Sequence, residues 1–96
     1  GITGMASAAA NSIADAYQRI RKQTDLPIVT GFGIRTAEQA AESANLSDGA
    51  VVGSAVVDII ADGVANPTSP HADENRAMIV RKVTAFVGEL SAAIRA

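Results

Sequence analysis

Two short apolar runs in this sequence each end at glycine and pass into a segment that can start a helix. They are Thr30-Gly31-Phe32-Gly33-Ile34 and Val51-Val52-Gly53-Ser54-Ala55. Glycine leaves the backbone uncovered where a ligand could approach, and Ser54 is placed to cap a short helix from Ala55 to Ala61. The start of a helix carries free N–H groups and about half a positive charge, which suits an anion. The two turns, with two helix starts facing one anion, therefore predict a phosphate-binding site.

The elements that must position these turns are two strands, predicted over residues 28–30 and 50–52. Both strands are continuously apolar instead of alternating, which is typical of a parallel sheet covered on both faces. Barrels of alternating strands and helices hold phosphate in the loops after their last two strands and at a short extra helix. The pattern therefore predicts an α/β fold of this kind.

Helices are predicted before and between the two strands. The first spans about residues 6–23, and its apolar stripe includes Tyr17 as a core residue. Thr36 and Gln39 have the spacing of a capping box, which opens the second helix. That helix presents a face of small residues suited to close packing on a sheet: Ala37, Ala40, Ala41 and Ala44.

After the short helix the sequence predicts a linker and one long terminal helix. Asp62-Gly63 and residues 66–70, which include two prolines, are assigned to the linker. The terminal helix spans about residues 73–96. Its apolar stripe is formed by Ile79, Val83, Phe86, Val87, Leu90 and Ile94.

The number of elements bounds how much of a barrel is present. A full eight-unit barrel of about 250 residues uses roughly 31 residues per unit. The 96 residues of this chain therefore correspond to about three units, of which the first lacks its strand. We expect residues 1–96 to be the C-terminal fragment of a single (β/α)8 TIM-barrel domain, with about two and a half βα units and a short extra phosphate-binding helix.

Composition excludes several classes of function. A net charge of −2 and a pI near 5.1 give no electrostatic basis for binding nucleic acid or an anionic membrane. The chain has no cysteine, so it forms neither disulfides nor thiolate metal sites. No apolar run approaches the roughly 20 residues of a membrane span. We expect no metal site.

The carboxylates are not placed to act on a ligand at the glycine turns. Asp25 and Asp48 precede their strands, which predicts that they lie at the opposite, stabilising end of the sheet. The other acidic residues fall on predicted helices or in the turns that follow them. The sequence therefore predicts no catalytic acid or base in this chain.

Three segments in order resemble the tryptophan synthase alpha chain family: Gly1-Ile2-Thr3-Gly4, Gly31-Phe32-Gly33-Ile34 and Gly53-Ser54-Ala55-Val56-Val57. The resemblance implies a cytoplasmic lyase of tryptophan biosynthesis that cleaves indole-3-glycerol phosphate to indole and glyceraldehyde 3-phosphate. It also implies an alpha2beta2 complex, in which the beta subunit holds pyridoxal phosphate and joins indole to serine. No cofactor is expected in this chain itself.

The resemblance also implies roles for individual residues. It places Gly4, Phe32, Gly33, Gly53 and Ser54 around the substrate phosphate.

Three further positions are read from the same family pattern. Thr3 matches a supporting threonine that contacts a catalytic aspartate when its loop closes, and Val51 matches an apolar position beside the indole ring. Arg35 stands where a small polar residue is common, either as a solvated cation or as an addition to the phosphate site. The family's catalytic glutamate and aspartate belong to an N-terminal part that this chain does not contain.

Two alternatives to this interpretation are open from the residues. One is another phosphate-binding barrel, such as those of histidine or thiamine biosynthesis or a flavin-dependent barrel, since their last strands also end in glycine-rich turns. The other is a non-catalytic module, such as a folding fragment or one half of a split chain that is stabilised by association.

Overall fold

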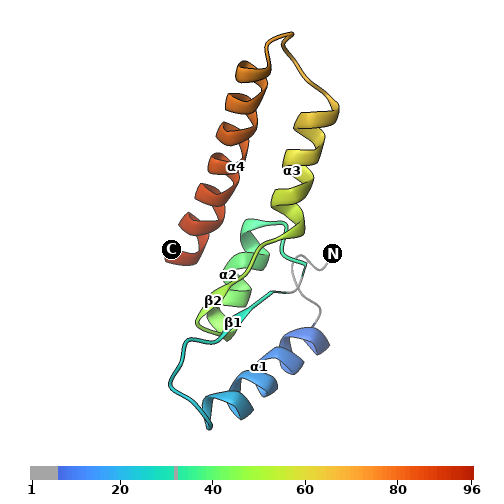
Figure 1. Cartoon of the computed structure of the whole chain (residues 1–96). Helices are drawn as coiled ribbons and strands as arrows, with labels where there is room; N and C mark the ends of the chain where they lie inside the picture. The colour runs from blue at the N-terminus through green and yellow to red at the C-terminus, as the bar shows by residue number, and fades with distance from the viewer. Residues whose placement is uncertain (1–6, 32) are drawn as a thin grey trace.

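The computed structural model describes residues 7–31 and 33–96, over which helices and strands alternate up to a final pair of helices (Figure 1). The elements are α1 (Ser7–Arg21), β1 (Val29–Thr30), α2 (Ala37–Leu46), β2 (Gly49–Ala50), α3 (Ser54–Ala65) and α4 (Ala72–Arg95). This order confirms the mixed α/β class. None of the helices described is long and apolar enough to cross a membrane.

The two strands form a parallel pair, with Val29 opposite Gly49 and Thr30 opposite Ala50. Two hydrogen bonds extend the pairing: Asp48 N–H donates to the carbonyl of Ile28, and Val51 N–H to that of Thr30, each at 2.8 Å. Parallel strands need a crossover, and α2 provides it. The second strand starts one residue earlier than predicted.

The two apolar strands are covered on only one face, as expected for a fragment that lacks the neighbouring strands of its sheet. Val29 is 54% exposed and Val51 is 50% exposed. Their neighbours Thr30, Ala50 and Val52 are half-buried. Successive side chains of a strand point to opposite faces, so the exposed and the half-buried residues lie on different faces of this two-stranded sheet. Helix α2 covers one face and leaves the other open.

The core lies where α2 meets the sheet and α4. Ile34, Ala40 and Leu90 are buried together, and Phe86 and Val52 pack against them. The predicted small-residue face of α2 is confirmed: Ala40 is fully buried, while Ala37, Ala41 and Ala44 are half-buried. Small side chains let α2 approach its neighbours closely, so this face of the helix determines how α4 packs.

Helix α3 is longer than predicted, because Asp62-Gly63 continues the helix instead of ending it. A Cβ atom at Gly63 would lie 2.3 Å from Cγ1 of Ile79 on α4. Glycine at this position therefore allows the two helices to pack closely side by side, as Figure 1 shows. Tertiary packing outweighs the weak helix propensity of glycine here.

Helix α4 confirms most of its predicted stripe. Leu90 is buried, and Ile79, Val83 and Phe86 are half-buried against α2 and α3. Val87 and Ile94 are instead 48% and 38% exposed. These two side chains lie at the edge of an apolar groove of about 330 Å³ between α4, α2 and the end of β2.

The chain as a whole is elongated, with extents of 54 × 34 × 23 Å and a radius of gyration of 16.3 Å. A compact domain of this length would have a radius of gyration of about 12 Å. Helix α1 packs against α2 at one end of the molecule, away from α4 (Figure 1). The described elements thus form an open arrangement with incomplete coverage of the sheet.

Candidate functional site

The two glycine-rich turns come together at the ends of β1 and β2. They line a hollow of about 210 Å³, which is formed by Gly31, Gly33, Ile34, Arg35, Val51, Gly53 and Ser54. Segments more than fifteen residues apart in the sequence therefore meet at the C-terminal edge of the sheet, as the strand-end pattern predicts. The predicted residues Gly33, Val51, Gly53 and Ser54 all border this hollow.

The glycines of the hollow have two different structural roles. Gly33 has a φ of +65°, in the left-handed region that side chains disfavour. A Cβ at Gly33 or at Gly53 would meet no atom within 4 Å, so both face open space. A Cβ at Gly31 would instead lie 3.2 Å from Cβ of Val51, so Gly31 lets the two turns approach each other.

The start of α3 differs from the prediction in one respect: Gly53, not Ser54, is the N-cap residue. The carbonyl of Gly53 accepts hydrogen bonds from the N–H groups of Val56 at 3.0 Å and Val57 at 3.1 Å. Ser54 is the first helical residue, and no side chain caps this helix. The first N–H groups of α3, including those of Ser54 and Ala55, have no partner within the helix and can bind an anion.

The start of α2 is capped by the protein's own side chains. Thr36 Oγ1 accepts a hydrogen bond from Gln39 N–H at 3.2 Å, which confirms the capping box. Gln39 Oε1 in turn accepts from the N–H groups of Arg35 at 2.7 Å and Thr36 at 3.2 Å. The N–H groups of Thr36 and Gln39 at the start of α2 therefore have side-chain acceptors, whereas no side chain caps the start of α3. The expectation that both helix starts face one anion stays a prediction.

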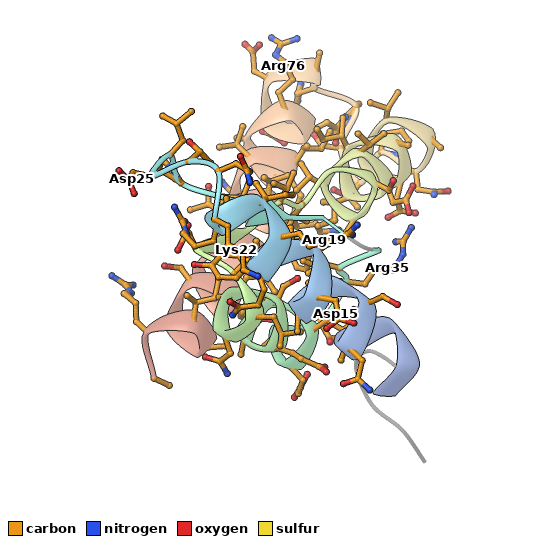
Figure 2. The ribbon with its side chains drawn as sticks, turned by 90° about the horizontal axis from the view of Figure 1, so that it is seen from below. Asp15, Arg19, Lys22, Asp25, Arg35 and Arg76 are labelled. Atoms are coloured by element: carbon orange, nitrogen blue, oxygen red, sulfur yellow. The ribbon has the colours of Figure 1, made fainter. Side chains whose placement is uncertain are left out.

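Arg35 is the one charged side chain among the described residues that line the hollow. Its Nη1 lies 2.8 Å from Oδ2 of Asp58, a residue in the second turn of α3. The two side chains are 55% and 60% exposed, and Figure 2 shows Arg35 on the outside of the molecule. The sequence did not reveal Asp58 as its partner, since the two residues are far apart along the chain.

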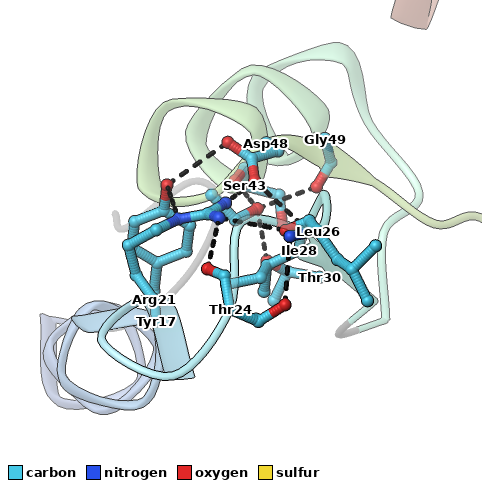
Figure 3. Close-up of polar contacts among 10 residues, drawn as sticks. Tyr17, Arg21, Thr24, Leu26, Ile28, Thr30, Ser43, Asp48 and Gly49 are labelled. Carbon is cyan, nitrogen blue, oxygen red and sulfur yellow. Dashed lines mark hydrogen bonds and ion pairs between the residues drawn. The ribbon is translucent and has the colours of Figure 1, made fainter. Parts of the chain in front are cut away.

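The opposite end of the sheet holds a polar network centred on Asp48 (Figure 3). The Asp48 carboxylate accepts a hydrogen bond from Ile28 N–H at 2.8 Å and one from the Tyr17 hydroxyl at 3.2 Å, and it forms an ion pair with Arg21. Arg21 also donates to the carbonyls of Thr24 and Leu26, each at 3.0 Å. The network ties α1 and its following loop to the start of β2.

These contacts shift two pKa values and correct one prediction. The Ile28 N–H and the Arg21 guanidinium hold the pKa of Asp48 below its ordinary value. The hydrogen bond with Tyr17, together with the charge of Asp48, raises the pKa of Arg21.

Tyr17 was predicted to be a core residue, but it is half-buried with its hydroxyl in this network. Asp48 lies at the stabilising end of the sheet, as its position before the strand predicts.

Three predicted site residues, Thr3, Gly4 and Phe32, lie outside the described residues. Within the described ranges, no group of three or more histidine, aspartate or glutamate side chains is arranged to hold a metal ion. The described part of the site thus offers backbone groups and the Ser54 hydroxyl, beside apolar side chains and with Arg35 at its edge.

Comparison with protein-family models gives a match to this chain. A sequence model described as the tryptophan synthase alpha chain matches residues 1–95, and so spans both glycine turns and all six elements. No solved structure matches the chain significantly. The match covers nearly the whole sequence, and the chain therefore belongs to the tryptophan synthase alpha chain family.

Proposed function

We propose that this chain is part of a lyase that cleaves indole-3-glycerol phosphate to indole and glyceraldehyde 3-phosphate. Membership in the family supports a role in tryptophan biosynthesis in general. The proposal goes further by assigning the hollow between the two glycine turns to the phosphate group of this substrate. In this assignment Gly33, Gly53 and Ser54 surround the phosphate, together with Gly4 and Phe32.

The fold of the complete protein is proposed to be a (β/α)8 barrel, of which these residues form the C-terminal part. Three features support this: the strands are parallel, Val29 and Val51 expose one face of the sheet, and the chain is more extended than a compact domain. An apolar sheet face of this kind needs further strands or helices to cover it. A protein that joins these 96 residues to the proposed N-terminal part of the barrel is the complete alpha chain.

The observation that carries the phosphate assignment is the uncapped start of α3 beside open glycines. Helix N–H groups without a partner point out of the helix start, and the helix dipole favours a negative charge there. Gly53 gives an anion access to these groups, because no side chain covers them. The apolar side chain of Val51, on the same hollow, fits the proposed contact with the indole ring.

The assignment is tested by Gly53→Val in the complete alpha chain, with glycerol 3-phosphate as the ligand in calorimetry. The valine side chain would occupy the open space in front of the helix start, so binding should be lost. Gly88→Val is the matched control, because a Cβ at Gly88 on α4 also meets no atom within 4 Å. An unchanged affinity of the Gly53 variant would exclude the hollow as the phosphate site.

The chemical step requires groups that these residues do not supply. Cleavage needs a proton delivered to the indole ring and another removed from the glycerol hydroxyl. In a barrel, the groups that transfer these protons lie at the C-terminal ends of strands. Asp48 lies at the other end and is bound to Ile28, Tyr17 and Arg21. The glutamate and aspartate that the family uses are therefore proposed to come from the N-terminal part of the barrel.

It follows that the 96-residue chain alone should release no indole from indole-3-glycerol phosphate, and that activity should return when the N-terminal part is added. Indole can be measured directly in both samples. Release by the isolated chain that disappears on mutation of one of its own carboxylates would refute this division of the site.

Partners follow from the same proposal. Alpha chains of this family work with a beta subunit and a small-molecule substrate in general. For this protein we propose the alpha2beta2 complex, in which the beta subunit holds the pyridoxal phosphate, and a cytoplasmic location.

A further inference from the structure

The hollow combines neutral donors with a single charge. The backbone N–H groups at the start of α3 and the Ser54 hydroxyl are neutral, whereas Arg35 carries a full positive charge. A phosphate monoester near pH 7 carries between one and two negative charges. Neutral amides alone leave most of that charge uncompensated. Arg35 lines the edge of the hollow, and its guanidinium, which pairs with Asp58 outside the lining, can turn toward an anion there.

The present partner of Arg35 holds it weakly. The Arg35 and Asp58 side chains are both more than half exposed, and exposed ion pairs of this type contribute little net stability. Phosphate has more charge and more acceptor oxygens than a carboxylate, and a guanidinium binds it with two parallel hydrogen bonds. An incoming phosphate can therefore draw the guanidinium away from Asp58.

Asp58 also has a second cation nearby. Lys82 on α4 lines the same groove of about 390 Å³ as Arg35 and Asp58. The groove therefore keeps one cation, Lys82, beside the carboxylates of Asp58 and Asp62 when Arg35 turns toward the hollow.

We propose that Arg35 is a specificity-determining residue that binds the substrate phosphate, and that Asp58 competes with the phosphate for its guanidinium. This inference rests on the proposed function of the hollow. Arg35 selects for the charge of the phosphate, while the glycine backbone and the α3 start select for its shape. Asp58 positions the guanidinium beside the hollow before the substrate arrives and weakens substrate binding by the energy of the ion pair.

The test is a double-mutant cycle in the complete alpha chain with Arg35→Gln, Asp58→Asn and the two combined. The measured quantities are KM for indole-3-glycerol phosphate and Kd for glycerol 3-phosphate. Because one exposed charge interaction is lost, Arg35→Gln should raise both by about fivefold and leave kcat nearly unchanged. Asp58→Asn should lower both by about twofold, since the guanidinium no longer has a competing partner.

The double variant distinguishes competition from direct repulsion. If Asp58 acts through Arg35, the combined variant should bind as weakly as Arg35→Gln alone. If the Asp58 substitution still improves binding without Arg35, the carboxylate repels the phosphate directly and the competition is refuted. The affinity of Arg35→Lys should fall between those of the unmodified protein and Arg35→Gln, because lysine keeps the charge but not the planar guanidinium.

Two controls separate this inference from the proposed function. Arg76→Gln removes a cation at the start of α4, where Arg76 pairs with Asp73, and should leave KM and Kd unchanged. The Arg35 effect should shrink when the salt concentration rises, because salt screens exposed charges. If Gly53→Val abolishes binding and Arg35→Gln does not weaken it, the hollow is the phosphate site and the role of Arg35 is wrong. If neither variant matters, the site itself is wrong.

Discussion

Gly63 is the position where a single methyl group should have the clearest effect on stability. On an exposed helix, replacing glycine with alanine stabilises by about 1 kcal/mol, because alanine loses less backbone entropy on folding. At Gly63 the new Cβ would lie 2.3 Å from Cγ1 and 2.8 Å from Cδ1 of Ile79. Ile79 is β-branched and lies in a helix, so its χ1 has one strongly preferred rotamer and cannot easily turn away.

The two effects oppose each other, and the steric effect should be larger. Forcing an extra carbon into a packed contact costs about 1–3 kcal/mol. Subtracting the gain in helix propensity leaves Gly63→Ala destabilising by about 1 kcal/mol. In a protein of 150–250 residues this corresponds to a loss of about 2–4 °C in Tm.

The assay is thermal unfolding of the complete alpha chain, followed by circular dichroism. Gly88→Ala on α4 is the matched control, because its Cβ meets no atom within 4 Å and it should raise Tm by about 2–4 °C. In an Ile79→Ala background the nearest clashing atoms are gone and the Ile79 Cβ position is 3.7 Å away. Gly63→Ala should then become stabilising. A stabilising effect with Ile79 in place, or no change of sign without it, would refute the steric argument.

Two further predictions concern the opposite end of the sheet and the open face. The folded-state pKa of Asp48 is lowered, so its contribution to stability is present above the ordinary carboxyl pKa of about 4 and is lost as the pH falls through the folded-state value. Asp48→Asn should therefore lower Tm at pH 7 and have no effect on Tm in strong acid. An equal loss of Tm at every pH would contradict this, and so would the same pH dependence in the exposed control Glu89→Gln. Because Val29 and Val51 leave apolar surface open, the isolated 96-residue chain should self-associate in sedimentation experiments, and a compact monomer with cooperative melting would disprove it.

Local signals in the sequence predicted much of the fold and part of the site. The capping box at Thr36 and Gln39 is a contact between residues three apart, so its spacing alone identifies it. The glycine turns follow apolar strands directly, and the parallel order of the strands brings them to one edge. These features depend on neighbours along the chain, which is why they could be read from the residues.

The features that were missed depend on partners far away in the sequence. Glycine often ends a helix, and only the contact with Ile79 explains why α3 continues through Gly63. Tyr17 fits an apolar stripe, but its hydroxyl reaches Asp48, thirty-one positions away. The partnership of Arg35 with Asp58 is of the same kind. Side-chain type gives the capacity for such contacts, and the fold determines which of them forms.

Capping explains why this edge of the sheet should bind one phosphate group at one helix start. Helices α2 and α3 both follow a strand and a glycine turn, and both begin with backbone N–H groups that need acceptors. At α2, Thr36 and Gln39 supply acceptors for two of these groups, and the Gln39 side chain also reaches back to Arg35 N–H. At α3, Gly53 has no side chain to supply one. An anion binds most favourably where no protein acceptor competes for the N–H groups, so the phosphate should bind at the start of α3. Arg35, from the turn before the capped start of α2, should then extend to meet it.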